Sequence, residues 1–238
     1  MSHLDRIPID LPRAIRQHDQ YLSALAEAGC VIERLPPAPE LPDGVFVEDT
    51  ALVLEELAVI TRPGAASRRV ETESVSAALA PFRPLRRIGG PGTLDGGDIL
   101  VTGRVLFVGL SGRTTSEGAA ELARLVAPAG YDVRLVPVRG CLHLKSAVSE
   151  VADATLLINP EWVDLAGFEE FRLIPIDPGE PFAANALRIG AQVIHAAAFP
   201  RTAKRLRAEG CDVREVEADE LAKAEGGVTC CSLLIADG

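Results

Sequence analysis

Two short acidic segments stand where apolar neighbours make a lone charge costly. The segment Asp95–Asp98 has the sequence Asp-Gly-Gly-Asp and precedes an apolar stretch, and Glu48 and Asp49 follow the apolar run Val45–Val47, at the expected end of a strand. A carboxylate buried among such neighbours is unfavourable unless a positive charge or a hydrogen-bond donor pairs with it. The segments therefore predict a site for a metal ion or an organic cation. Asp-Gly-Gly-Asp also fits an ordinary turn whose carboxylates cap backbone groups.

A cysteine and a histidine have contexts that suit nucleophilic and acid–base chemistry. Cys230 follows two glycines, which let the backbone approach a ligand closely, and precedes an expected strand over 233–235. On such a strand Cys230 and Cys231 face opposite sides, so at most one thiol faces a site. His143 lies between two leucines, and strand alternation places it opposite the core face, where a neutral imidazole can carry protons. A buried structural thiol and a structural histidine are the competing interpretations.

Two arginines occupy equivalent places in the chain. Arg68 and Arg113 each stand at an expected junction between a strand and a helix. A guanidinium at such a junction can bind a carboxylate through two parallel hydrogen bonds. Ordinary surface arginines explain either residue alone.

The elements that must position these residues repeat along the sequence. Each copy is expected to contain an apolar strand, a short turn, a second apolar strand and an amphipathic helix. The hairpins are expected at 50–61, 99–110 and 186–197, with helices at 67–82, 114–126 and 200–209, and a degenerate copy is expected around 154–159 and 171–176. Periods of about 40 to 50 residues are typical of units that stack to bury a shared core.

Helix boundaries follow from the residues that flank each expected helix. Ser67 and Thr114 are the expected N-caps, and Gly130 and Gly210 are the expected helix ends. The segment 11–29 is expected to be the helix of a further copy whose hairpin is incomplete or missing. The sequence thus predicts an α/β protein of repeated hairpin–helix units, in which loops from different repeats converge near an axis.

Composition narrows the class of protein. The chain of 238 residues is 47% hydrophobic and has no linker-like segment, so one domain over 1–238 is expected. The net charge of −10 opposes nucleic-acid binding and suits a cationic small molecule. The five cysteines form no C-x-x-C pair, which indicates reduced thiols. No apolar run of about 18 residues and no signal peptide are evident, so a cytoplasmic protein without a membrane partner is expected.

Six segments, in this order, resemble the dimethylarginine dimethylaminohydrolase (dimethylargininase) family of the guanidino-group-modifying pentein superfamily. They are Leu41–Asp49, Ile60–Arg69, Gly92–Asp98, Phe107–Thr114, Leu142–Ser146 and Thr229–Ser232, preceded by Arg13–His18. The resemblance implies a pentein α/β propeller of hairpin–helix modules with pseudo-fivefold symmetry, whose first module is incomplete here. It also implies hydrolysis of Nω-methylated arginines to citrulline and methylamine or dimethylamine, with no metal and no organic cofactor.

The same resemblance implies a role for each candidate residue. Cys230 matches the nucleophile, His143 the general acid and base, and Asp95 the third member of the triad. Five further residues match substrate contacts: Glu48 and Asp49 at the guanidinium, Asp43 near the amino-acid end, and Arg68 and Arg113 at the α-carboxylate. The implied intermediate is a covalent thiouronium on Cys230.

Arginine deiminase is the nearest relative to separate from this family. It carries an acidic residue two positions after its catalytic histidine, whereas the corresponding residue here is Lys145. A carboxylate that would contact an unsubstituted guanidinium nitrogen is therefore missing, which favours methylated arginine as the substrate.

The N-terminus departs from the family pattern. Members begin with a strand and a lid loop, whereas only about ten residues precede the first expected helix, so Leu4 is the expected remnant of the lid. Three alternatives stay open: a deiminase acting on another guanidino compound, a protein that binds arginine derivatives without turnover, and a metal-dependent hydrolase, which lacks the usual ligand spacing. A homodimer is the assembly considered.

Overall fold

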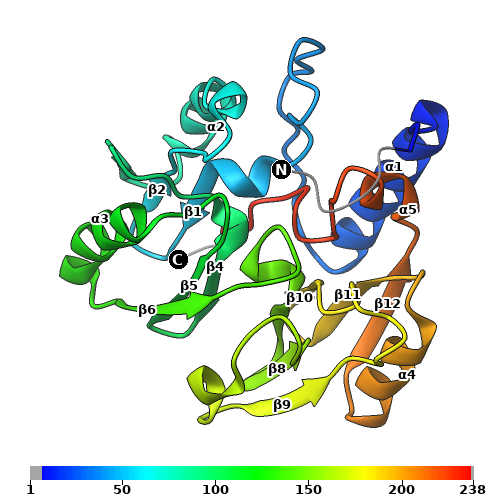
Figure 1. The fold of residues 1–238 in the computed structure, drawn as a ribbon. Helices are drawn as coiled ribbons and strands as arrows, with labels where there is room; N and C mark the ends of the chain where they lie inside the picture. The colour runs from blue at the N-terminus through cyan, green and yellow to red at the C-terminus, as the bar shows by residue number, and fades with distance from the viewer. Residues whose placement is uncertain (1–6, 237–238) are drawn as a thin grey trace. The chain divides into compact units, whose positions relative to one another are not determined.

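The computed structural model describes residues 7–236 (Figure 1). These residues form two compact units. The first unit contains the described residues up to Glu33 together with Arg139–Thr229, and the second contains Arg34–Val138 together with the described residues from Cys230 onward. The expectation of one domain over 1–238 stays a prediction.

A common strand pattern repeats four times among the described residues. Each copy is a three-stranded sheet in which an antiparallel hairpin is followed by a third strand parallel to the hairpin's second strand. The second unit holds β1 (Ala51–Val53), β2 (Ala58–Ile60) and β3 (Leu85–Arg87), then β4 (Ile99–Thr102), β5 (Val105–Leu110) and β6 (Asp132–Pro137). The first unit holds β7 (Val148–Ala152), β8 (Thr155–Ile158) and β9 (Arg172–Pro175), then β10 (Ala186–Ile189), β11 (Gln192–Ala196) and β12 (Asp212–Val216). The repeat prediction is confirmed. It omitted the parallel third strand of three copies, whereas β9 of the fourth copy lies in the expected segment 171–176.

The helices lie close to their predicted positions. They are α1 (Leu11–Glu27), α2 (Glu71–Leu79), α3 (Ser116–Val126), α4 (Pro200–Ala208) and the short α5 (Asp219–Ala222). The expected N-caps were wrong: Thr115 caps α3 by accepting a hydrogen bond from the Gly118 N–H, and α2 starts after Val70 because Ala66–Arg68 forms a separate 3-10 turn, η2. No helix in the range 7–236 is long and apolar enough to cross a membrane.

Further 3-10 turns join the strands and helices. They are η1 (Val47–Thr50), η3 (Gly96–Asp98), η4 (Ala127–Ala129), η5 (Leu144–Ser146) and η6 (Leu165–Phe168). The degenerate copy expected in the middle of the chain is a complete sheet, β7–β9, in which η6 stands where the other copies have a helix. Gly130 has a φ of 82° after η4, as expected for the residue that stops a helical segment.

Each unit has a core that two neighbouring sheets share. In the second unit, Val59 of β2, Leu106 and Val108 of β5 and Leu122 of α3 belong to one buried cluster. In the first unit, the sheets meet where β7 contacts β10, and their buried side chains join those of α4, including Leu206. A hairpin–helix copy therefore buries its apolar face only by stacking on its neighbour.

The helix α1 belongs to the first unit, where it packs against α5 and β12. Its side chain Gln17 is buried, donates to Asp219 Oδ1 at 2.6 Å and accepts from the Glu220 N–H at 3.0 Å. Arg13 donates to the same Asp219 oxygen at 2.8 Å. These contacts fix the start of the segment that leads to Cys230.

His195 of β11 gives the first unit a pH-sensitive core position. Its Nε2 lies 2.8 Å from the Ala183 carbonyl oxygen, and its Nδ1 is buried without a hydrogen-bond partner. Burial lowers the pKa of His195, and the Ala183 carbonyl opposes that shift only in part. The imidazole is therefore held neutral, with the proton on Nε2.

Lowering the pH should destabilise the protein through His195. The unfolded chain takes up the proton first, so this contribution to stability is intact above a pH of about 6.5 and is lost as the pH falls below it. One such proton changes the free energy of unfolding by at most about 1.4 kcal/mol per pH unit. Between pH 7.5 and pH 5.5, the free energy of unfolding measured in urea should fall less for His195→Gln than for the wild type. An equal fall in the free energy of unfolding for the two proteins would contradict this role of His195.

Candidate active site

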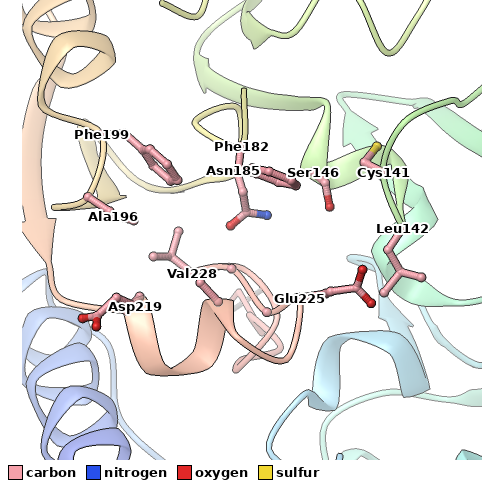
Figure 2. Close-up of a pocket in the computed structure, with 15 residues that line it drawn as sticks. Cys141, Leu142, Ser146, Phe182, Asn185, Ala196, Phe199, Asp219, Glu225 and Val228 are labelled. Atoms are coloured by element: carbon pink, nitrogen blue, oxygen red, sulfur yellow. The ribbon is translucent and has the colours of Figure 1, made fainter. Parts of the chain in front are cut away.

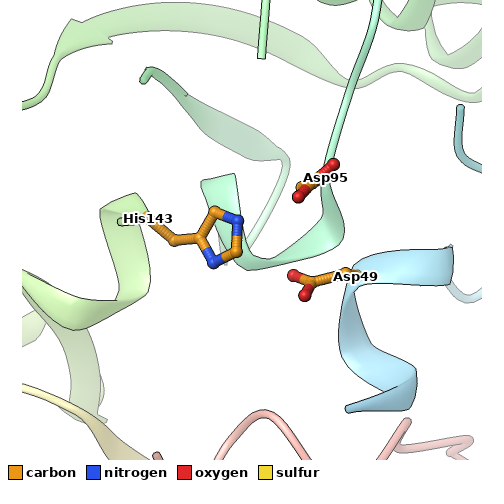
Figure 3. A group of neighbouring side chains, drawn as sticks. All are labelled: Asp49, Asp95 and His143. Atoms are coloured by element: carbon orange, nitrogen blue, oxygen red, sulfur yellow. The ribbon is translucent and has the colours of Figure 1, made fainter. Parts of the chain in front are cut away.

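Two carboxylates of the second unit, Asp49 and Asp95, lie beside each other. Asp49 is in η1 and Asp95 directly precedes η3, and these turns pack together; carboxylate oxygens of the two residues lie within 4.8 Å (Figure 3). Gly96 permits this approach because a Cβ at that position would collide with the Glu48 carbonyl oxygen. Both aspartates are buried. Their role in binding a cation stays a prediction.

Asp49 is held at both oxygens. Its Oδ1 accepts a hydrogen bond from the Gly97 N–H at 3.1 Å, and its Oδ2 forms an ion pair with Nη1 of Arg68. Its own carbonyl oxygen accepts from the Thr61 hydroxyl at 2.6 Å. The expected strand end at this position was wrong, because the two acidic residues lie in a 3-10 turn before β1. That turn directs Asp49 toward η3.

Arg68 is a buried cation that organises this part of the second unit. Its Nε and Nη2 donate to Glu71 at 3.0 and 2.8 Å, and Nη2 also donates to the Phe46 carbonyl at 2.8 Å and to the Asp43 carbonyl at 3.4 Å. Burial disfavours the charge, but Asp49 and Glu71 outweigh it and raise the pKa of Arg68 above its usual value. The guanidinium thus fixes the chain from Asp43 to Asp49. Its predicted contact with a substrate α-carboxylate stays a prediction.

Asp95 is held by the backbone and faces an arginine. Its Oδ1 accepts from the Gly64 N–H at 2.8 Å, its own N–H donates to the Thr114 hydroxyl at 3.1 Å, and Arg113 Nη1 lies 3.8 Å from Oδ2. The Arg113 side chain is 20% exposed, against 6% for Arg68, so it is the less enclosed of the two arginines. The Gly64 N–H and the Arg113 guanidinium thus both orient the Asp95 carboxylate.

The turn interpretation of Asp-Gly-Gly-Asp is also correct for part of the motif. The Asp98 N–H donates to the Asp95 carbonyl at 3.0 Å, which closes the turn. The Asp98 carboxylate accepts from the Ser111 hydroxyl at 2.6 Å, and that hydroxyl accepts from the Arg113 N–H at 3.0 Å. Asp98 therefore supports the loop that carries Arg113.

Cys230 lies beside Glu48 in the second unit. The Glu48 N–H donates to the Cys230 carbonyl at 3.1 Å. No strand forms over 233–235, so the argument that strand alternation separates the two cysteines was wrong. Cys230 is nevertheless half-buried and Cys231 buried, and burial followed by the charge of Glu48 raises the pKa of Cys231 to about 12. Cys231 is therefore a poor source of thiolate at neutral pH.

His143 belongs to the first unit and precedes η5; Figure 3 labels it. The expected strand here was wrong: His143 has an extended conformation at the end of a bend, directly before a 3-10 turn. Its carbonyl oxygen accepts from the Ser146 N–H at 3.0 Å and from the Cys141 thiol at 3.3 Å, while the next residue, Leu144, is fully buried. The backbone that bears the imidazole is thus fixed by its own turn.

One predicted site residue cannot be placed, and two partners of the site aspartates and arginines were not predicted. Leu4, the expected lid remnant, lies outside the described residues. The partners Gly64 and Glu71 were not foreseen: Glu71 could have been found from its spacing of three residues after Arg68, whereas Gly64 acts through a backbone N–H and has no sequence signal.

Asp49 and Asp95 could also supply oxygen ligands to a metal ion, although each already faces an arginine, which opposes a further cation.

The fold places the chain in a known class of proteins. A solved structure of the *Pseudomonas aeruginosa* enzyme DDAH, a Cys-to-Ser mutant in complex with citrulline, matches with a TM-score of 0.94 and 36% identity over 98% of this chain and 92% of that chain. The N-terminal domain of a cyanobacterial arginine dihydrolase matches with a TM-score of 0.87 at 21% identity, over 96% of this chain and 88% of that one, which shows the fold alone. The chain has the α/β pentein propeller fold of the guanidino-group-modifying superfamily.

Sequence comparison narrows this class to one family. The N(G),N(G)-dimethylarginine dimethylaminohydrolase of *Pseudomonas aeruginosa* is 38% identical over 98% of this chain and 91% of the relative. The enzyme of the same name from *Streptomyces coelicolor* is 39% identical over 98% and 90%. No model of a known protein family matches the chain. The protein belongs to the dimethylarginine dimethylaminohydrolase family.

Proposed function

We propose that this protein hydrolyses Nω-methylated arginines, asymmetric dimethylarginine and monomethylarginine, to citrulline and dimethylamine or methylamine. The observation that carries the proposal is the buried pair Asp49 and Asp95 in a chain of this family, with Cys230 joined to the neighbouring Glu48. Two solved relatives support the substrate class, one in complex with citrulline and one a His-to-Gly mutant adduct with S-methyl-L-thiocitrulline, which matches with a TM-score of 0.93.

The proposed reaction has two covalent stages. The Cys230 thiolate attacks the guanidinium carbon, the bond to the methylated nitrogen breaks, and His143 gives a proton to the departing amine. A thiouronium remains on Cys230. His143 then takes a proton from water, and the resulting hydroxide attacks the same carbon. The carbon–sulfur bond breaks, the added hydroxyl loses its proton to solvent, and citrulline leaves the Cys230 thiolate and the protonated His143.

In this proposal the carboxylates and arginines bind the substrate and orient the imidazole. A guanidinium carbon is a poor electrophile because resonance spreads its charge, so the substrate must be fixed before attack. Glu48 and Asp49 hold the guanidinium, and Asp95 orients the imidazole and stabilises its positive form. Asp43 contacts the amino-acid end of the substrate. Arg113, with its partly exposed guanidinium, is assigned to the α-carboxylate. Arg68 is assigned to the support of Asp49, with which it forms a buried ion pair.

Citrulline release from asymmetric dimethylarginine, monomethylarginine and arginine, measured in parallel, tests this function. We expect kcat/KM on the methylated substrates to exceed that on arginine by about tenfold or more, since Lys145 replaces the acidic residue of the deiminases. Turnover of arginine alone would identify a deiminase. Binding of methylarginine without citrulline would identify a binding protein, and a metal requirement in the purified protein would favour the metal-dependent hydrolase.

Two sequence predictions about the cellular form of the protein stay predictions: a cytoplasmic location and a homodimer. The chemistry proposed here needs neither, because every assigned residue belongs to one chain. Nucleic acid is not part of the proposal, since the substrate is a small cation.

A further inference from the structure

A buried asparagine of the first unit, Asn185, ties two catalytically important segments together. It stands directly before β10 and lines a cavity of about 260 Å³, into which Figure 2 shows its amide projecting. Its Nδ2 donates to the Lys145 carbonyl at 3.0 Å and to the Thr229 hydroxyl at 3.0 Å, while its Oδ1 accepts from the Thr229 N–H at 3.1 Å. One amide thus uses three of its hydrogen-bonding positions.

The chemistry of the partners fixes the orientation of this amide. The Lys145 carbonyl can only accept and the Thr229 N–H can only donate, so the reversed orientation would break both contacts. Gly227 allows the approach, because a Cβ there would collide with the Asn185 side chain. The backbone next to Asn185 is also held in place. The N–H of the following residue, Ala186 of β10, donates to the Ser149 hydroxyl of β7 at 3.1 Å.

The two tethered segments are those that bear the proposed acid–base and nucleophilic groups. Lys145 lies two residues after His143 in the turn η5, and Thr229 is the residue immediately before Cys230. We infer that Asn185 is a positioning residue, which holds the η5 turn that follows His143 at a fixed separation from Thr229, the residue bonded to Cys230. The inference rests on the proposed function, because that function assigns the paired roles of His143 and Cys230.

Removal of the tether should reduce the chemical step more than substrate binding. A misplacement of about 1 Å between reacting groups can cost on the order of 10²-fold in rate. For Asn185→Ala and Asn185→Asp we expect kcat to fall by about 10- to 100-fold, with KM changed by less than about threefold. Asn185→Asp keeps an acceptor for the Thr229 N–H but sets a carboxylate against the Lys145 carbonyl.

Asn159 of the same unit provides a matched control. It is also buried, its Nδ2 donates to the Pro181 carbonyl at 2.9 Å, and its Oδ1 accepts from the Glu161 N–H at 2.9 Å. It holds neither the His143 turn nor the Cys230 loop through these bonds. Asn159→Ala and Asn159→Asp should lower Tm as much as the Asn185 variants while leaving kcat within about twofold at a temperature where all are folded.

A second readout separates this inference from the proposed function. The rate at which iodoacetamide alkylates Cys230, followed by mass spectrometry across pH, should shift in the Asn185 variants and not in the Asn159 variants. Equal effects of the two asparagines on kcat and on alkylation would overturn the positioning role. A wild type that turns over no guanidino substrate would overturn the proposed function, and the alkylation comparison would then still decide the role of Asn185.

Discussion

Cys230→Ser should abolish citrulline release, by at least about 10³-fold in kcat, whereas Cys231→Ser should retain most of it. The two thiols are adjacent, but they differ in the property that decides reactivity. Cys231 is buried, and its pKa of about 12 leaves almost no thiolate at pH 7. Cys230 is half-buried, and its carbonyl is joined to the Glu48 N–H. Only Cys230 combines access to a ligand with a place beside the carboxylates.

The comparison needs folded variants, because a serine hydroxyl at the Cys231 position is buried. Such a hydroxyl costs about 1–3 kcal/mol when it lacks a full set of hydrogen bonds, so Cys231→Ser should have a lower Tm. Initial rates measured well below that Tm remove this effect. An active Cys230→Ser with an inactive, folded Cys231→Ser would mean that the nucleophile is the other sulfur, and the proposed mechanism would have to be rebuilt around it.

The strongly apolar part of the fold was predictable from the sequence, and the weakly apolar part was not. The hairpins β4–β5 and β10–β11 are mostly apolar and have turns at Gly103 and Gly190, so their pattern is visible locally. Among the third strands of the four sheets, β9 lies in a segment expected to be a strand, 171–176, but the other three were missed. One of these, β3, has the sequence Leu-Arg-Arg and is mostly exposed. Its place is set by parallel pairing with β2, which no local pattern reveals.

The residue types of the site were predictable, but their supports were not. Glu48, Asp49, Asp95, His143 and Cys230 stand out by chemistry and by family resemblance. Three of the segments that carry them are 3-10 turns or irregular loops where strands were expected, because single turns of this kind have no hydrophobic period. Their hydrogen bonds, such as Gly64 to Asp95, join residues far apart in the chain and follow only from the folded structure.

Arg68→Met should destabilise the protein by about 3–5 kcal/mol, since it leaves Asp49 and Glu71 buried without their cation. Arg68→Lys should also be destabilising, although it keeps the charge, because an ammonium cannot span two carboxylates and two carbonyls. Arg104→Met is the matched control in the same unit: Arg104 also faces two carboxylates, Glu55 and Glu56, but it is exposed. Its loss should change Tm far less, which urea and thermal unfolding of the three variants would show.

The activity of Arg68→Lys decides whether Arg68 acts on the substrate directly or through Asp49. All the contacts of Arg68 described here are to Asp43, Phe46, Asp49 and Glu71, so we expect kcat/KM to fall equally on methylated arginine and on its decarboxylated analogue, methylated agmatine. A fall confined to the substrate that has an α-carboxylate would instead establish direct binding. Arg113→Lys provides the comparison: its partly exposed guanidinium should produce a loss that depends on the α-carboxylate.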